Sequence, residues 1–327
     1  MLITRLGAIV VVAALAAPAS DALAQAKFPN RPIRILIPFA AGGGTDVVAR
    51  IVGQRLTEQT GQPVIVEAKP GAGGGIAVNE LMRAEPDGYT VLLTTSSHAT
   101  LPALAKLAWH PSNDFVPIAA VYSYTFALGT NIANTSRYKT FGEFVAYAKS
   151  NPGKANWGSS GIGGPQHLAG AQFAKLAGIE MLHVPYRGNG PMMQALVSNE
   201  VQVTFDTQTL VIPQVEAGKV KALAIASEQR SPRMPDVPTI RESGLDFSIQ
   251  ITNFVLAPKG TPAAIQAALN KEIASALADK SVRERLEGFG HTVPLPAENT
   301  AAAVKQHIDG FHGTYGRLIA ELGIKAE

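Results

Sequence analysis

Three stretches rich in glycine and hydroxyl side chains are the places in this chain whose residue types and spacing could bind a ligand. They are 38–46 (PFAAGGGTD), 96–98 (SSH) and 158–164 (GSSGIGG). Glycines between a strand and a helix leave backbone N–H groups open where the helix dipole is positive, so such a turn can hold an anion. The first and third stretches have this form. They predict a site for a small anion, and a carboxylate is the ligand we expect.

The glycine turns lack the spacing of nucleotide-binding loops. A P-loop needs Gly-Lys followed by Ser or Thr, but Gly44 is followed directly by Thr45. A dinucleotide turn needs a third glycine or alanine where Val47 stands, and the glycine run at 71–75 has Ile76 in the corresponding place. We therefore expect no nucleotide cofactor. For any one of these turns, the simpler explanation is a tight connection that needs a positive φ angle.

A serine hydrolase is the enzymatic alternative. Ser160 lies in a Gly-x-Ser-x sequence, but Ile162 occupies the position of the last glycine of a nucleophile elbow. His167 and Asp206 could complete a triad with Ser160, although the sequence alone does not bring the three side chains together.

Composition limits the classes of function. Of the 327 residues, 46% are hydrophobic and 16% are charged, which is enough for a large core and argues against disorder. The net charge of +3 and the lack of a basic stripe argue against a nucleic-acid partner. Because the chain has no cysteine, disulfides, thiolate metal sites and a cysteine nucleophile are excluded. His307 and His312 are five residues apart and so lie on different helix faces, and we expect no metal.

Residues 1–24 are typical of a secretory signal peptide. Arg5 precedes an apolar run at 6–17, and Ala22-Leu23-Ala24 supplies small residues for cleavage before Gln25. The apolar run is too short to span a bilayer. We therefore expect an exported protein that is soluble once this segment is removed.

The glycine turns need strands and helices to position them, and the hydrophobic pattern predicts a βα alternation. Buried strands are expected at 33–37, 64–66 and 89–94, with helices at 47–56 and up to residue 81 between them. Two long extended runs, 116–128 and 247–256, are expected to cross between two domains, and the alternation restarts over 141–226. Strands that alternate with helices imply parallel sheets, which bind ligands at the carboxyl ends of their strands.

Two such domains joined by two crossings form a cleft that can close about a hinge. The predicted boundaries are 25–122 plus 248–327 for domain 1 and 123–247 for domain 2. In the returning part, Thr261 is expected to cap a helix that has Pro262 at its first position. The last helix is expected to have an apolar face made of Val304, Ile308, Phe311, Tyr315 and Leu322.

Segments spread along the chain, taken in order, resemble the Bug family, the extracytoplasmic solute receptors of tripartite tricarboxylate transporters. The matching segments are PFAAGGGTD (38–46), EPDGYT (85–90), GSSG (158–161), QHLAG (166–170), HVPYRG (183–188), RSP (230–232), PDVPT (235–239) and APKGTP (257–262). The resemblance covers nearly all of the chain after residue 24. It implies an α/β fold, a two-domain, type II-like periplasmic binding protein in which each domain is a mainly parallel sheet flanked by helices and two crossing strands join the domains.

By this resemblance the protein is a non-enzymatic receptor in the periplasm that binds a small carboxylate, either a di- or tricarboxylate or an aromatic acid. It would act as a monomer without cofactor or metal, and it would deliver the ligand to the membrane permease subunits of the transporter. A membrane sensor as partner, in place of a permease, stays open. In the family, backbone N–H groups, hydroxyls and ordered waters hold the ligand carboxylate, with few charged side chains.

The resemblance also assigns site residues. Arg187 is not among them; from its residue type alone it could pair with an anion or stay solvated. The sequence departs from the family pattern at 98–102, 109–111 and 205–207, and it has only one aromatic residue, Phe254, where the family usually has a pair. These departures leave the identity of the ligand open. The binding positions of the family fall on Phe39, Gly42, Gly43, Gly44 and Thr45, on Ser97 and His98, on Ser159, Ser160 and Gly161, and on His167, Tyr186 and Asp206.

Overall fold

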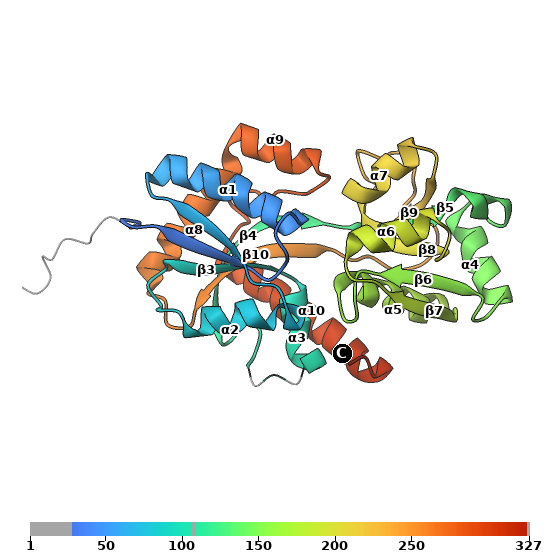
Figure 1. Cartoon of the computed structure of the whole chain (residues 1–327), viewed down its shortest axis with the longest axis horizontal. Coiled ribbons are helices and arrows are strands. Elements are labelled where there is room, and N and C mark those ends of the chain that lie inside the picture. The colour runs from blue at the N-terminus through green and yellow to red at the C-terminus, as the bar shows by residue number, and fades with distance from the viewer. Residues whose placement is uncertain (1–27, 106, 108, 326–327) are drawn as a thin grey trace, which may run out of the picture.

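The computed structural model describes residues 28–105, 107 and 109–325. The predicted signal peptide and its cleavage site before Gln25 lie outside these residues. The described chain forms two lobes, each built on a five-stranded sheet with helices on both faces (Figure 1). The α/β fold predicted from the alternation of strands and helices is confirmed.

The first lobe holds the sheet β2-β1-β3-β10-β4, in which β1 pairs in parallel with β2 and β3, and β10 runs antiparallel between β3 and β4. Helices α1, α8 and α9 pack on one face of this sheet, and α2, α3 and α10 pack on the other (Figure 1). The strands are β1 (Ile33–Ile37), β2 (Val64–Ala68), β3 (Thr90–Thr95), β4 (Phe115–Tyr124) and β10 (Ile251–Pro258). The helices are α1 (Gly44–Thr60), α2 (Gly75–Arg83), α3 (Ser97–Ala105), α8 (Ala263–Ala278), α9 (Lys280–Gly288) and α10 (Ala301–Leu322), with a 3₁₀ turn at Ala72–Gly74.

The second lobe repeats this plan with the sheet β7-β6-β8-β5-β9. Here β6 pairs in parallel with β7 and β8, and β5 runs antiparallel to β8 and β9. Helices α4 and α5 pack on one face, and α6 and α7 on the other. The elements are β5 (Phe126–Asn131), a 3₁₀ turn (Ile132–Ser136), α4 (Phe141–Ser150), β6 (Ala155–Ser159), α5 (Pro165–Ala177), β7 (Met181–Pro185), α6 (Asn189–Val197), β8 (Val203–Thr207), α7 (Gln208–Glu216) and β9 (Val220–Ile225).

The antiparallel strand of each sheet is the one that has just crossed from the other lobe. β4 ends at Tyr124 in the first sheet and β5 begins at Phe126 in the second, so the run predicted as one extended segment is two strands. Between them, the Thr125 hydroxyl donates to the carbonyl of Ile249 on the returning segment at 2.9 Å. The two crossings are therefore tied side by side.

Local chemistry explains where the first helix forms. The helical period puts Val48, Ile51 and Val52 on one buried face of α1, which packs on β1, and Leu56 continues that face. The helix stops at Gly61, whose φ of 71° is the left-handed conformation that terminates helices. The packing of α1 on β1 holds the glycine turn before α1 at the carboxyl end of β1.

Some predictions about helices are wrong. Thr261 does not cap α8: Pro262 is the N-cap, and the Thr261 hydroxyl donates to the Pro258 carbonyl at 2.8 Å. Leu322 is 45% exposed at the end of α10, because the helix has run past the sheet there. Helices α7 and α9 were not predicted, since α7 carries Pro213 inside it and α9 is mostly charged. None of the helices in the described ranges is long and apolar enough to cross a membrane.

Candidate functional site

Five helices that follow parallel strands start without a side-chain cap. These are α1, α2, α5, α6 and α7, with Gly43, Gly74, Gly164, Gly188 and Thr207 at their N-caps. By contrast α4, α9 and α10, which follow no parallel strand, are capped by side chains, and α8 starts at a proline. Because the first N–H groups of an uncapped helix need an acceptor, the carboxyl-end edges of both sheets offer donors to an anion.

In the first lobe, this edge carries the exposed turn Gly42–Gly44, with the half-buried Phe39 before it. Asp46 accepts a hydrogen bond from the N–H of Gly42 at 2.9 Å and two more, also at 2.9 Å, from the Arg50 guanidinium. Arg50 holds the pKa of Asp46 below its usual range. The ion pair fixes the turn and neutralises the nearby carboxylate, so the helix start keeps its attraction for an anion.

Packing does not explain all three glycines of this turn. Gly42 needs to be glycine because its φ is +82°. Gly43 has an ordinary φ of −75°, and a Cβ there would meet only the Ala40 carbonyl at 3.4 Å. At Gly44 a Cβ would meet nothing within 4 Å. Bare backbone at these two positions therefore favours close approach of a ligand over a purely structural turn.

In the second lobe, the matching turn is held by its own side chains. The Ser159 hydroxyl is hydrogen-bonded to His183 Nε2 at 2.7 Å, and the Ser160 hydroxyl donates to Gln166 Oε1 at 2.8 Å. The N–H of Gly163 donates to His167 Nδ1 at 2.9 Å. The hydroxyls and the histidine thus fix the loop, and the Gly161 N–H also donates to the Ser159 hydroxyl at 3.3 Å. The donors that remain for a ligand are the first backbone N–H groups of the uncapped helix α5.

A hydrolytic triad is not assembled. In the described part of the chain no hydrogen bond joins Ser160, His167 and Asp206, because each side chain is bonded elsewhere. The His167 ring instead stacks on His183 with ring centroids 3.9 Å apart, and burial lowers the pKa of both to about 4, so both are neutral. The geometry therefore indicates that His167 holds the second glycine turn in place through its bond to the Gly163 N–H.

Of the remaining predicted positions, Ser97 and Tyr186 lie near strand ends, and His98 is packed in the interior. Ser97 starts α3 after the end of β3, the strand paired with β1, and its hydroxyl lies 2.7 Å from that of Thr95. His98 is buried, stacks on Trp109 at 5.0 Å and bonds the Pro111 carbonyl, so its surroundings give it a packing role rather than a place at the edge. The Tyr186 backbone N–H donates to the Ser159 carbonyl, which places Tyr186 beside the second turn, while its hydroxyl donates to Glu200.

The two lobes meet where the second turn reaches α3. A Cβ added at Gly163 would lie 2.4 Å from the Leu104 side chain of the first lobe. Further contacts join α7 to the end of α9, where the Thr209 hydroxyl donates to the Phe289 carbonyl at 2.5 Å. Among the described residues no hydrogen bond joins Gly43 to Ser160, so their convergence on one ligand stays a prediction.

A group of polar residues around the crossing, here called the crossing cluster, was missed from the sequence. It comprises Tyr122, Tyr124, Asn253 and His291. Asn253 pairs across the strands with Tyr122, whose ring lies 4.4 Å from that of His291. Tyr122 also faces the side chain of Thr45, at the start of α1. Both amide atoms of Asn253 and Nδ1 of His291 are buried with no partner in the described chain.

Because buried polar atoms are nearly always hydrogen-bonded, the unpartnered atoms of the crossing cluster make it a candidate place for a water or a polar group of a ligand. The alternation of tyrosines at 122 and 124 within the first crossing run was the only sequence signal for it.

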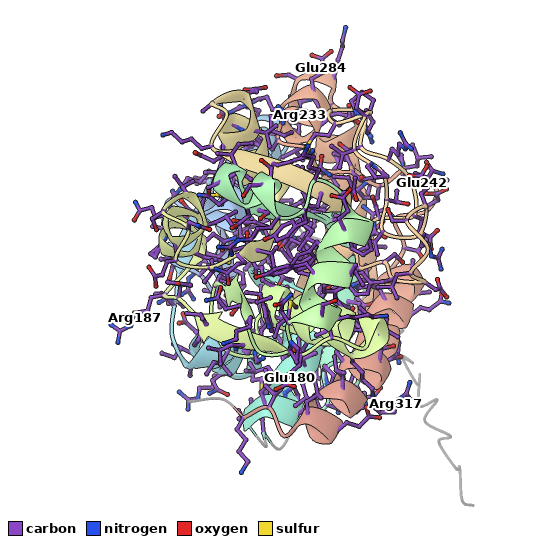
Figure 2. The ribbon with its side chains drawn as sticks, turned by 90° about the vertical axis from the view of Figure 1, so that its right-hand side faces the viewer. Glu180, Arg187, Arg233, Glu242, Glu284 and Arg317 are labelled. Atoms are coloured by element: carbon purple, nitrogen blue, oxygen red, sulfur yellow. The ribbon has the colours of Figure 1, made fainter. Side chains whose placement is uncertain are left out.

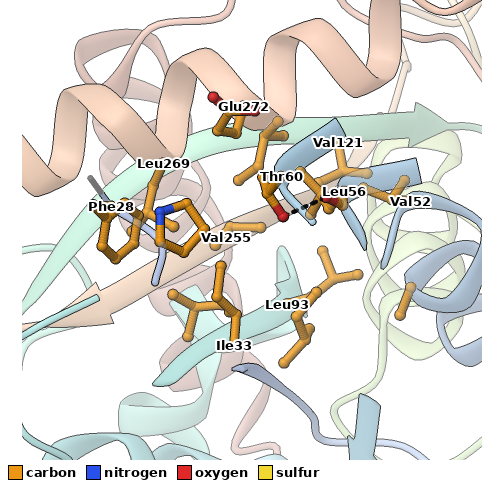
Figure 3. A pocket seen from close by; sticks show the side chains of 15 residues that line it. Phe28, Ile33, Val52, Leu56, Thr60, Leu93, Val121, Val255, Leu269 and Glu272 are labelled. Carbon is orange, nitrogen blue, oxygen red and sulfur yellow. Dashed lines mark hydrogen bonds between the residues drawn. The ribbon is translucent and has the colours of Figure 1, made fainter. Parts of the chain in front are cut away.

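Two of the cavities among the described residues lie elsewhere. One, of about 30 Å³, is inside the first lobe between the sheet and α1 and α8, and is lined by apolar side chains such as Phe28, Leu56 and Leu269 (Figure 3). It is too small and too apolar for a carboxylate. The other, of about 360 Å³, lies in the first lobe around Arg31, which is paired with Asp87.

Arg187 is exposed and points outward, away from both lobes' sheets (Figure 2). No cluster of His, Asp or Glu in the described ranges could hold a metal.

Three solved structures share this fold over most of the chain. The periplasmic binding protein BugD has a TM-score of 0.79 at 34% identity, covering 92% of this chain and 100% of its own. MatC from Rhodopseudomonas palustris, with bound malate, has a TM-score of 0.79 at 34% identity, covering 89% and 100%. The R. palustris protein Rpa4515, with adipate, has a TM-score of 0.80 at 27% identity, covering 92% and 100%.

Sequence comparison agrees with the shared fold. The protein BugT of Bordetella pertussis is 32% identical over 332 residues, which are 99% of this chain and 98% of BugT. Residues 48–324 match the model of the tripartite tricarboxylate transporter family receptor. The chain therefore belongs to the Bug family of tripartite tricarboxylate transporter receptors.

Proposed function

We propose that this protein is an extracytoplasmic receptor that binds a small carboxylate between its two lobes and delivers it to the membrane permease subunits of a tripartite tricarboxylate-type transporter. The ligand is a di- or tricarboxylate or an aromatic acid. Malate in MatC and adipate in Rpa4515 support the ligand class. The periplasmic location of BugD supports export, in agreement with the predicted signal peptide.

The observation that carries the proposal is the matched pair of uncapped helix starts, α1 in the first lobe and α5 in the second. Each begins at a glycine turn on the carboxyl-end edge of its sheet, where backbone N–H groups and the helix dipole favour an anion. A dicarboxylate has two carboxylate groups, so it can accept hydrogen bonds from both lobes at once.

Binding to both lobes couples ligand capture to closure. A ligand shifts an open–closed equilibrium only by its differential affinity for the two states. Donors contributed by both turns act together only when the lobes are closed, so the ligand favours the closed form. The closed form then presents the surface that the permease recognises.

A thermal-shift panel tests the ligand class. L-malate, adipate, citrate and benzoate are compared with an uncharged sugar. We expect at least one carboxylate to raise the melting temperature and the sugar to leave it unchanged. A sugar that stabilises the protein while every carboxylate fails would show that the ligand class is wrong. Capture of membrane partners by the liganded protein then distinguishes a permease from a membrane sensor.

A further inference from the structure

Asp206 is a fully buried carboxyl group with only one of its oxygens in use. It is 0% exposed near the carboxyl end of β8. Its Oδ1 accepts hydrogen bonds from Asn189 Nδ2 at 2.9 Å and from the Thr207 N–H at 2.7 Å. Its Oδ2 has no partner within the ranges that the structure describes. Since a buried polar atom without a partner destabilises the fold, Oδ2 needs an explanation.

The groups that face Asp206 carry no positive charge. From α6 comes the neutral amide of Asn189, and the phenol of Tyr124 in β4 lies close enough to feel the carboxylate. From α7, Gln208 is bonded to Ser231, and the adjacent strand β5 is uncharged. His291, behind Tyr124, is neutral because burial lowers its pKa to about 4.

His167, on α5 across the sheet, is neutral for the same reason. A charge buried without a counter-ion is strongly disfavoured, and burial accordingly raises the pKa of Asp206 to about 7.

The hydrogen bonds decide where the proton of the neutral acid lies. Oδ1 already accepts two N–H groups, so the proton belongs on Oδ2. A protonated carboxyl is a donor, so Oδ2–H needs an acceptor, and no N–H or O–H group of the described protein already holds Oδ2.

The surroundings point to an anion as that acceptor. Gly158 lies opposite Thr204 in the ladder of β6 and β8, so Asp206 lies next to Ser160 and the second glycine turn. The uncapped starts of α6 and α7 flank it through Asn189 and Thr207. With Asp206 neutral, these helix starts attract the ligand rather than the side chain of the protein.

We propose that Asp206 is a specificity residue that binds as a carboxylic acid, with Oδ2–H donating a hydrogen bond to a carboxylate oxygen of the ligand. This inference rests on the proposed function, since the acceptor is the carboxylate ligand. Above the pKa of Asp206 the free protein must take up one proton from solvent to bind. Affinity is therefore full well below pH 7, is halved near pH 7 and falls further as the pH rises.

Calorimetric titration of the full mature protein with L-malate and adipate tests the proposal. Between about pH 6 and about pH 8.5, we expect the dissociation constant of the wild type to rise about 30-fold, because a group with a pKa of about 7 must be protonated for binding. At the higher pH, two buffers of different ionisation enthalpy should report uptake of one proton per ligand.

Two variants make the test specific. Asp206→Asn keeps an N–H donor in place of Oδ2–H, so its affinity should be the same at both pH values and its binding should take up no proton. Asp246→Asn removes an exposed carboxylate paired with Arg241 and should keep the wild-type pH profile. Tight binding that does not depend on pH in the wild type, or a wild-type profile in Asp206→Asn, would overturn the proposal.

A ligand-free measurement separates this inference from the proposed function. Infrared spectra near pH 6 should show the C=O band of a protonated carboxyl that disappears in Asp206→Asn or on titration above pH 8. Absence of that band overturns the role of Asp206 even if carboxylates bind. If no carboxylate binds the wild type at either pH, the proposed function fails and this inference fails with it.

Discussion

Gly163 in the second lobe lies directly against Leu104 in the first, so closely that a Cβ at Gly163 would be 2.4 Å from Leu104 Cδ1. Gly163 belongs to the second glycine turn, and Leu104 lies on α3, the helix that begins at Ser97. This contact brings predicted site segments of both lobes to one place. Gly163 also has a φ of +71°, a conformation that favours glycine.

Replacing Gly163 with alanine should weaken ligand binding. The methyl group collides with Leu104 and also strains the turn, so the arrangement of the lobes that brings Gly163 against Leu104 loses stability. We expect an affinity loss of about 5- to 150-fold, since overpacking of this kind against Leu104 costs about 1–3 kcal/mol. Calorimetry with a carboxylate that binds the wild type measures it. The matched control is Gly142→Ala, where a Cβ meets nothing within 4 Å. Wild-type affinity in a folded Gly163→Ala protein would show that this contact does not belong to the binding-competent state.

Replacing Gly43 with valine should abolish most binding without unfolding the protein. Its φ of −75° suits valine, and the only atom near the new Cβ is the Ala40 carbonyl at 3.4 Å. The branched side chain would cover the open N–H groups at the start of α1. Loss of one charge-assisted hydrogen bond costs about 1.5–3 kcal/mol, or about 10- to 150-fold in affinity. Circular dichroism checks the fold and calorimetry checks the affinity. The smaller Gly44→Ala should lose less. Unchanged binding by a folded Gly43→Val protein contradicts the anion turn.

The elements that the sequence predicts well are those set by local pattern. The apolar run at 33–37 is β1 without adjustment, and the glycine turn after it leads into α1 as expected. The α5 turn at 158–164 is also in its predicted place. These features depend on hydrophobic period and on glycine, which act within a few residues. Helix α7 was missed because Pro213 inside it argues against a helix.

The site was predicted only in part, because some of its members depend on long-range packing. Asn253 and Tyr122 meet through pairing of β10 with β4, which no local pattern encodes. His98 follows the serines at the end of β3, yet the chain turns it into the core against Trp109. On sequence alone His167 could complete a triad with Ser160, but in the structure its Nδ1 accepts a backbone N–H and its ring stacks on His183.

Asn253→Leu should raise stability and lower affinity. Leucine has a similar size and removes two buried amide atoms that lack partners in the described chain. Removing such atoms relieves about 1–3 kcal/mol, which should raise the melting temperature of the free protein by a few degrees. If the amide binds the ligand or its waters, the same change weakens binding. Asn253→Asp adds a negative charge and should weaken carboxylate binding further. Differential scanning fluorimetry and calorimetry give the two quantities. A leucine variant that binds as tightly as the wild type would remove Asn253 from the site.

Acid should destabilise the protein between about pH 6.5 and pH 4.5. Burial lowers the pKa of His98, His167, His183, His291 and His307 to about 4, against an ordinary value of 6.5. The unfolded chain therefore binds protons first as the pH falls through 6.5, and the free energy of unfolding decreases. Asp206 acts in the opposite direction, since its raised pKa favours the folded state as the pH falls through 7, but it is one group against five.

Thermal melts across this pH range measure the effect. We expect the melting temperature to fall by several degrees or more from pH 7 to pH 4.5. A flat profile would mean that these histidines are solvated in solution rather than buried.

The central claim is that both lobes donate backbone N–H groups to one carboxylate ligand. An amide NMR titration of the full mature protein tests it most directly, with the resonances of Gly43 and Gly44 in the first lobe and Gly161 in the second followed together. The account predicts that all three move with the same dissociation constant as the carboxylate is added. Movement of the resonances of one lobe alone at saturation would contradict it.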